Sequence, residues 1–252
     1  MMVRTKALVI KEYIVGESDK YITLFTKDLG RIQAIAPKAK KSDKGFASAT
    51  QLFVYGDFML TSYKDTYRLV SVDLIEMFHN IRNDLSALSY ASYMMEFIYY
   101  VTEPGLSQSE LLKLTLVTLQ ALSKSEADYK RIRRVFEIRA LGLLGFMPQL
   151  FACVDCGLAI DEKAEAHYYF SAEAGGLVCK GCKGTYEDGV SLSYSTLYTL
   201  QYILTVSLKQ LYHFQISEEV QKELDAVGNH YVPYYVDKPF KTLDFIERLE
   251  KL

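Results

Sequence analysis

The chain has 252 residues, half of them hydrophobic, which is enough for one large core or two smaller ones. Its formal net charge of −2 excludes a uniformly basic protein that coats DNA, and no apolar run is long enough to span a bilayer. Residues 1–11 lack the apolar centre and cleavage site of a secretory signal, so we expect a cytoplasmic protein without a membrane partner.

Residues 3–76 are typical of β-structure. Strands are expected over 3–13, 21–26, 31–36, 51–62 and 66–76, because apolar and polar residues alternate there between turn residues. Gly30 ends the tight turn between the second and third strands, where positive φ is available to it. Five short strands, mostly joined by hairpins, predict a small barrel. The OB-fold is the five-stranded choice, while the pattern alone leaves an SH3-like barrel open.

The segment 37–48, between the third and fourth strands, carries four lysines among Gly, Ser and Pro and is expected to be a mobile loop. Residues 1–80 hold 12 Lys and Arg against 9 Asp and Glu, so a polyanion site is favoured in this part of the chain. The loop is either a solvated charged loop or an arm that grips phosphates. In the second case, Phe46 or the strand tyrosines would be the stacking surfaces.

From about residue 83 the hydrophobic period becomes helical. Helices are expected over 85–102, 111–122, 131–144, 194–209, the segment after Ser217, and 240–252. Ser107–Glu110 has the pattern of a capping box, Ser193 and Ser217 are expected to cap their helices, and Gly145 is expected to end the third helix. The predicted domains are 1–80, an OB-fold, and 81–252, an all-α domain. The predicted fold class is therefore α+β.

The four cysteines form two C-x-x-C pairs, Cys153 with Cys156 and Cys179 with Cys182, separated by 22 residues. Each pair can bind one ion from a turn, and the second pair completes a tetrahedron. One pair alone would suggest a redox site, but two matched pairs favour a structural zinc ion, one per chain. The module is predicted to be zinc-ribbon-like, to be inserted at 150–190 and to contain a hairpin at 168–176.

Arg131, Arg133 and Arg134 form a basic turn at the start of the predicted central helix. Arg131 and Arg134 share one helix face. These arginines either pair with nearby acids such as Asp128 and Glu137 or form a receptor for DNA or an acidic peptide. Arg139, further along the same apolar helix, is expected to make a buried ion pair or to bind backbone carbonyls.

Catalytic motifs are absent from the sequence. It has no phosphate-binding loop with Lys-Ser/Thr, no G-x-S-x-G elbow and no H-E-x-x-H. The carboxylates do not form a cluster typical of a metal-dependent nuclease. We therefore expect a protein that is not an enzyme.

The order of these parts resembles one family, the bacterial recombination mediator RecO. Residues that resemble its N-terminal barrel are Gly16–Asp19, Leu24–Thr26, Gly30-Arg31 and the basic loop. Residues that resemble its central helix are Arg134–Glu137 with Leu141, Leu144 and Gly145. The cysteines match the zinc-bearing members. In the loop, lysines stand where the family usually has arginines, so the positive charge is kept.

The resemblance implies a barrel that binds single- and double-stranded DNA and promotes strand annealing. It also implies partnership with RecR and with the acidic C-terminal tail of single-stranded DNA-binding protein, and indirect help in loading RecA at gaps. When the family's DNA contacts are carried over residue by residue, they are expected at Arg31, Lys38, Lys40, Lys41 and Lys44. Tail binding is expected at Arg131 and Arg134, since a groove with arginines at its lip suits a peptide ending in acids and an apolar residue.

A second hypothesis belongs to another class: a protein–peptide adaptor whose barrel does not itself bind DNA. The two hypotheses differ in whether DNA affinity is present and falls with added salt. A metal-dependent nuclease is a distant third.

Overall fold

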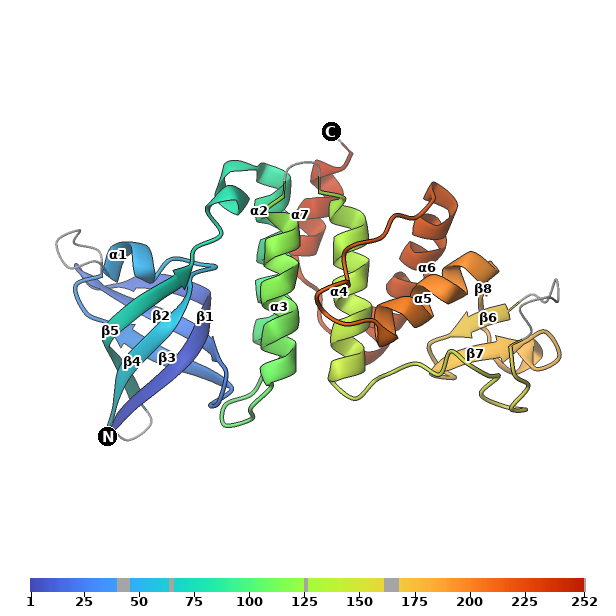
Figure 1. The fold of residues 1–252 in the computed structure, drawn as a ribbon, viewed down its shortest axis with the longest axis horizontal. Coiled ribbons are helices and arrows are strands. Elements are labelled where there is room, and N and C mark those ends of the chain that lie inside the picture. Colours follow the sequence, from blue (N-terminus) through green and yellow to red (C-terminus); the bar gives the residue numbers. More distant parts are fainter. Residues whose placement is uncertain (40–45, 64–65, 125–126, 161–167, 252) are drawn as a thin grey trace. The chain divides into compact units, whose positions relative to one another are not determined.

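The computed structural model describes residues 1–39, 46–63, 66–124, 127–160 and 168–251. The chain divides into two compact units, residues 1–127 with 240–252 and residues 128–239. A closed barrel comes first, helices follow, and a small three-stranded sheet lies in the second unit (Figure 1). The predicted α+β fold class is confirmed. No helix in the described ranges is both long and apolar enough to cross a membrane.

The barrel consists of β1 (Met2–Val15), β2 (Asp19–Thr26), β3 (Arg31–Ala36), β4 (Tyr55–Tyr63) and β5 (Thr66–Glu76). Its closed order is β1-β2-β3-β5-β4, the strand order of an OB-fold. All neighbouring pairs are antiparallel except β3 with β5. Alternate residues of each strand point inward and form the core, which includes Ile22, Leu24, Val54, Phe58 and Leu60.

The turn between β2 and β3 has the glycine that its geometry requires. Gly30 has a φ of 65°. A Cβ there would lie 2.3 Å from the carbonyl oxygen of Glu103, so the close approach of that backbone also excludes other residues. The sequence prediction of positive φ at this position is confirmed.

The sequence predicts a mobile loop for the connection from β3 to β4, but the last residues of this connection are ordered. Phe46–Ala49 forms a short helix, α1, and Phe46 packs against the barrel core. The backbone then turns, with the N–H of Val54 donating to the carbonyl of Gln51 and Phe53 at a φ of 70°, so β4 begins at Tyr55. The expected strand start at residue 51 is therefore wrong, while the proposed stacking role of Phe46, which is half-buried, stays a prediction.

The first unit also contains a 3-10 turn, η2 (His79–Asn83), and the helices α2 (Leu85–Val101), α3 (Ser109–Leu122) and α7 (Lys241–Leu249). Helix α7 packs against α2, where Phe240 contacts the rings of Tyr93 and Phe97. The predicted capping box is wrong. No side chain caps α3 at Gln108, because the hydroxyl of Ser107 donates instead to the carbonyl of Lys27.

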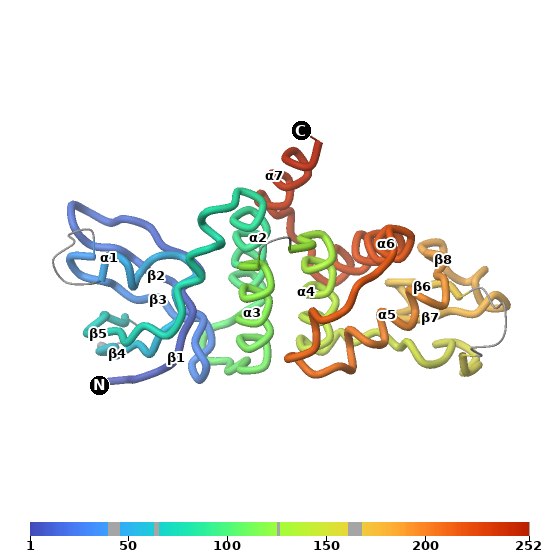
Figure 2. Tube along the Cα trace, turned by 45° about the horizontal axis from the view of Figure 1, so that its top comes forward, coloured from blue at the N-terminus to red at the C-terminus, as the bar shows by residue number. Residues whose placement is uncertain are grey.

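The second unit is built on α4 (Tyr129–Leu143), which contacts both α5 (Tyr194–Thr205) and α6 (Glu218–Tyr235) (Figure 2). Ser193 and Ser217 cap α5 and α6, as predicted. Strands β6 (Tyr168–Ser171), β7 (Gly176–Cys179) and β8 (Val190–Leu192) form an antiparallel sheet in the order β7-β6-β8 beside α6. A 3-10 turn, η3 (Lys183–Thr185), follows β7.

Candidate metal centre and nucleic-acid interface

Each C-x-x-C pair is shaped by a tight turn. In the first, the N–H of Gly157 donates to the carbonyl of Cys153, and Gly157 has a φ of 70°. In the second, the N–H of Cys182 donates to the carbonyl of Cys179 at the end of β7. Both turns therefore present two sulfur atoms on one side, the arrangement of a zinc knuckle.

The two turns are held together by the backbone of β7. The N–H of Val154 donates to the carbonyl of Leu177, and the N–H of Leu177 donates to the carbonyl of Gln149. A Cβ on Gly176 would lie 2.3 Å from the Gln149 carbonyl oxygen, so glycine permits this approach. Strand β7 thus positions the cysteines of both pairs.

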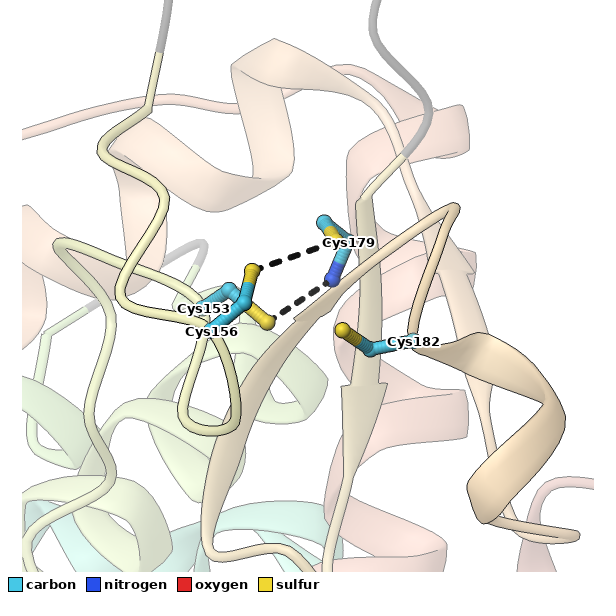
Figure 3. Close-up of side chains that lie close together, drawn as sticks. All are labelled: Cys153, Cys156, Cys179 and Cys182. Atoms are coloured by element: carbon cyan, nitrogen blue, oxygen red, sulfur yellow. Dashed lines mark hydrogen bonds between the residues drawn. The ribbon is translucent and has the colours of Figure 1, made fainter.

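The four sulfur atoms converge on one point. They all lie within 4.8 Å of one another, and the Sγ atoms of Cys156 and Cys179 are 3.7 Å apart (Figure 3). A tetrahedral zinc ion with Zn–S bonds of about 2.3 Å places its ligands about 3.8 Å apart. All four cysteines are free thiols. The cluster can therefore hold a metal ion, and its soft donor set and separations fit zinc.

The hydrogen bonds at the cluster favour thiolate at Cys153. Burial alone would raise the pKa of this thiol, but N–H groups of Cys156, Cys179 and Asp155 outweigh burial and lower its pKa to about 6. At Cys182, hydrogen bonding to the sulfurs of Cys179 and Cys156 raises the pKa to about 12. Because crowded thiols cannot all lose their protons without a cation, four thiolates at this cluster would require a bound positive ion.

The cysteine cluster lies beside a hairpin whose turn is organised by Asp188. Its carboxylate accepts hydrogen bonds from the Ser171 hydroxyl and from the N–H groups of Ala172 (2.7 Å) and Glu173 (3.0 Å). Burial alone would raise the pKa of Asp188, but these hydrogen bonds hold it below its ordinary value. The sequence pattern did not single out Asp188, because it lies outside the hairpin that it organises.

On the barrel, Arg31 is held in place by the backbone and by an aromatic ring. Its Nε donates to the carbonyl oxygen of Thr102 (3.0 Å), and its guanidinium lies over the ring of Tyr99, 4.3 Å from the centroid. The ammonium of Lys11 lies 4.7 Å from the same centroid. Sequence reasoning missed Lys11 and Tyr99, since their approach depends on how α2 packs on β1.

Beside Arg31 lies a cavity of about 590 Å³, lined by Leu29, Arg31, Ile32, Gln33, Tyr67, Pro104 and Gly105. It lies where β3 meets the connection between α2 and α3. Its lining combines one guanidinium and one amide with apolar side chains, so it offers both charge and contact area.

The other predicted DNA-contact residues lie beyond β3. Lys38 is exposed, has a φ of 55°, and donates its backbone N–H to the carboxylate of Asp19 (2.9 Å). Lys40, Lys41 and Lys44 lie outside the described residues. Arg31 and Lys38 both belong to the β3 side of the barrel, at opposite ends of that strand.

The arginines at the start of α4 have partners within the second unit. The side chain of Arg134, 4% exposed, bonds to Glu137 (2.8 Å) and Asp225 (2.6 Å) and also to Asn229. Arg131 bonds to the carbonyl of Phe214 and lies 3.7 Å from the Asp128 carboxylate. These contacts match the alternative in which the arginines pair with nearby acids, and they leave Arg134 little room to receive a peptide carboxylate.

Two other sequence predictions on α4 are confirmed. Arg139 donates to the carbonyls of Ile203, Leu204 and Val206, as expected of a buried arginine with a structural role. Gly145 follows the helix with a φ of 97°, and the N–H of Phe146 donates to the carbonyl of Leu141.

The closed barrel, the helices and the four-cysteine cluster define an α+β protein of the OB-fold class with a cysteine module that could hold a metal ion. The family description "Recombination protein O N terminal" matches residues 1–78, and "Recombination protein O C terminal" matches residues 82–244.

Curated relatives agree with these matches over almost the whole chain. "DNA repair protein RecO" of Acetivibrio thermocellus is 36% identical over 249 residues, which is 99% of this chain and 98% of the relative. The protein of the same name from Thermoanaerobacter sp. strain X514 is 32% identical over 251 residues, 100% and 99% of the two chains. The chain belongs to the RecO family, and its role is in DNA repair and recombination.

Proposed function

We propose that this chain is a non-enzymatic recombination mediator that binds single- and double-stranded DNA through its barrel and promotes the annealing of complementary strands. With RecR and single-stranded DNA-binding protein, it would help to load RecA at gaps. Such work on the bacterial chromosome would place it in the cytoplasm, at the nucleoid. The observation that carries the proposal is a closed OB-fold barrel with Arg31 beside a cavity and Lys38 exposed beyond β3.

The test is DNA affinity as a function of salt. Each phosphate contact contributes a slope of about −0.9 to log K against log salt on duplex DNA. Replacing Lys38, Lys40 and Lys41 by Gln is expected to weaken binding and to make the slope shallower by up to about 2.7. The measurement is fluorescence anisotropy of a labelled duplex and a labelled single strand between low and physiological salt.

The matched control removes the same charge from the second unit by replacing the exposed residues Lys209, Lys222 and Lys238 with Gln. It is expected to keep the wild-type slope. Equal affinity and slope in the barrel variant and in wild type would show that the loop does not bind DNA. Absence of DNA affinity in the wild-type protein would favour the adaptor hypothesis.

We further propose that the four-thiolate cluster holds one structural zinc ion per chain. Four sulfur ligands complete a tetrahedron and leave no open position for a substrate. Elemental analysis is expected to find one zinc per chain, and Cys179→Ser is expected to lose it and to expose residues 150–190 to limited proteolysis. Absence of metal from the wild-type protein, together with four titratable thiols, would contradict the zinc site.

Binding of the acidic tail of single-stranded DNA-binding protein near Arg131 and Arg134 stays a prediction. Because Arg134 is buried among acids, its replacement by Ala would also destabilise the second unit. The informative variant is therefore Arg131→Gln, tested for peptide affinity by calorimetry at a temperature where its circular dichroism matches wild type. Unchanged peptide affinity would remove Arg131 from the site.

A further inference from the structure

Two tyrosines stack on the outside of the barrel. Tyr13 of β1 and Tyr21 of β2 are direct cross-strand partners, and their rings lie 5.4 Å apart at an interplanar angle of 8°. Tyr13 is 46% exposed, and Tyr21 is half-buried. Cross-strand aromatic pairs often serve only to stabilise a hairpin. The side chains around this pair indicate a role beyond stabilising the hairpin.

The stack is open on the side of Tyr13. Strand β1 pairs with β4 only as far as Leu8, so no strand in the described chain pairs with β1 beside Tyr13 on the side away from Tyr21. A third flat ring can therefore stack on the open side of Tyr13, parallel to the two tyrosine rings. On the other side, Tyr21 pairs with Ile35 of β3, and Ile35 pairs with Arg68 of β5, so one row of side chains crosses four strands.

Cations surround this row. Lys11, two residues before Tyr13, shares its face of β1, and Lys11 and Arg31 both lie over the ring of Tyr99. The backbone N–H of Lys38 has the largest effect in lowering the pKa of Asp19, and the exposed side chains of Arg68 and Lys38 also lie close enough to this carboxylate to lower it.

Two of the nearby acids, Asp19 and Glu12, are already engaged. The carboxylate of Asp19 accepts hydrogen bonds from the Lys38 N–H and the Ser18 hydroxyl. That of Glu12 bonds to the Lys20 ammonium and accepts from the N–H of Leu52. The stacked rings therefore lie among cations whose charge these acids only partly offset. Flat apolar rings flanked by cations are what a single-stranded nucleic acid requires, since its bases stack while its phosphates need positive charge.

We infer that Tyr13 and Tyr21 form a base-stacking platform, which receives one unpaired nucleobase on the open side of Tyr13. Lys11 would contact the phosphate next to this base, and Lys38 with Arg68, at the other end of the row, would contact phosphates further along the same nucleic-acid strand. The inference rests on the proposed DNA-binding function of the barrel and makes it more specific. Because a base in a duplex offers no free face, the platform discriminates in favour of single strands.

The absence of tryptophan from the sequence allows a direct test. The Tyr13→Trp protein has a single indole, at the proposed stacking position. Oligodeoxythymidylate is expected to quench its emission, whereas inorganic polyphosphate, which has charge but no bases, is expected to leave it unchanged. The matched control is Tyr198→Trp, which places the indole at an exposed position of α5, and its emission is expected not to respond to either polymer.

Affinity provides the second measurement. Replacing Tyr13 and Tyr21 together by Ala is expected to reduce single-strand affinity by about five- to a hundredfold, the effect of losing one base–aromatic stack. Duplex affinity, which depends on phosphate contacts, is expected to stay at the wild-type value. Circular dichroism establishes that the variant is folded, and the tryptophan reporter tests the inference independently if it is not.

The outcomes distinguish failure of the stacking platform from failure of the proposed DNA-binding function on which it rests. Quenching by the oligonucleotide alone, with selective loss of single-strand affinity, supports the platform. Salt-dependent DNA binding by wild type, combined with no quenching or with equal quenching by polyphosphate, overturns the platform and leaves the proposed function standing. Absence of any DNA binding by wild type overturns both.

Discussion

Arg134 shows how a residue that resembles a ligand-binding arginine can belong to the core. Its guanidinium meets the fully buried carboxylate of Glu137 on its own helix and that of Asp225 on α6. Glu137 also accepts from Arg133 (2.8 Å). Removing one member of such a cluster leaves an uncompensated buried charge. The cluster therefore joins α4 to α6.

Gly228 of α6 makes this cluster possible. A Cβ at this position would lie 2.6 Å from Nη1 and 2.9 Å from Cδ of Arg134. Alanine gains about 1 kcal/mol of helix propensity over glycine. Displacing Arg134 from its carboxylates costs about 3–5 kcal/mol, so Gly228→Ala is expected to lower the free energy of unfolding by about 2–4 kcal/mol.

Urea denaturation measures this loss. The control is Gly184→Ala in η3, where an added Cβ meets no atom within 4 Å, and its expected change is within about 0.5 kcal/mol. If the Gly228 variant proved as stable as wild type, Arg134 would be free to move. Its predicted role in peptide binding would then regain support.

Among the elements, the sheet of β6, β7 and β8 depends on one carboxylate. Asp188 precedes β8 and ties its connection to the turn between β6 and β7 through three hydrogen bonds. The pKa of Asp188 is lowered in the folded state, so its ionised form stabilises the fold. This contribution is present above the unfolded pKa, near about 4, and is lost as the pH falls through the lower, folded value.

Asp188→Asn is expected to cost about 1.5 kcal/mol at neutral pH, the low end for hydrogen bonds to a charged group, because solvent reaches this carboxylate. Hydrogen exchange of the Ala172 and Glu173 amides is the measurement, and faster exchange in the variant is the expected result. The difference from wild type should shrink below pH 4, where Asp188 itself becomes protonated. A pH-independent difference would mean that shape, rather than charge, organises the turn.

The sequence predicts helices and strands well where residues close together in the chain determine them. Strands β3 and β5 have the predicted bounds, and Ser193 and Ser217 cap the predicted helices, because alternation and hydroxyl caps are local signals. The capping box failed because the Ser107 hydroxyl finds a partner 80 residues away, at Lys27. Distant packing of this kind has no local sequence signal.

The candidate sites also differ in whether local sequence signals could predict them. The cysteine cluster was predictable, since the ligand spacing within each pair is local and four soft donors specify a metal. The burial of Arg134 could not be predicted, because its partners Asp225 and Asn229 belong to a helix more than ninety residues further along the chain. The approach of Lys11 and Arg31 to Tyr99 depends equally on packing between elements distant in sequence.

At the scale of the whole molecule, the excess of basic residues and the four-cysteine cluster lie in different units. The barrel and the cations near Tyr13 lie in residues 1–127, and the four cysteines lie in residues 128–239. Residues 1–80 have an excess of basic over acidic residues, and the rest of the chain has the reverse. A protein with two compact units need not unfold in one step.

We therefore expect two transitions in calorimetry, each responding to one ligand. Removal of zinc by a chelator should lower the transition of the second unit, because metal binding energy is folding energy for a thiolate cluster. Oligodeoxythymidylate at a hundred times its dissociation constant should raise the other transition through a stabilisation of about 2.7 kcal/mol. A single transition that moved with both ligands would show that the two units unfold together, and chelation would then weaken DNA binding as well.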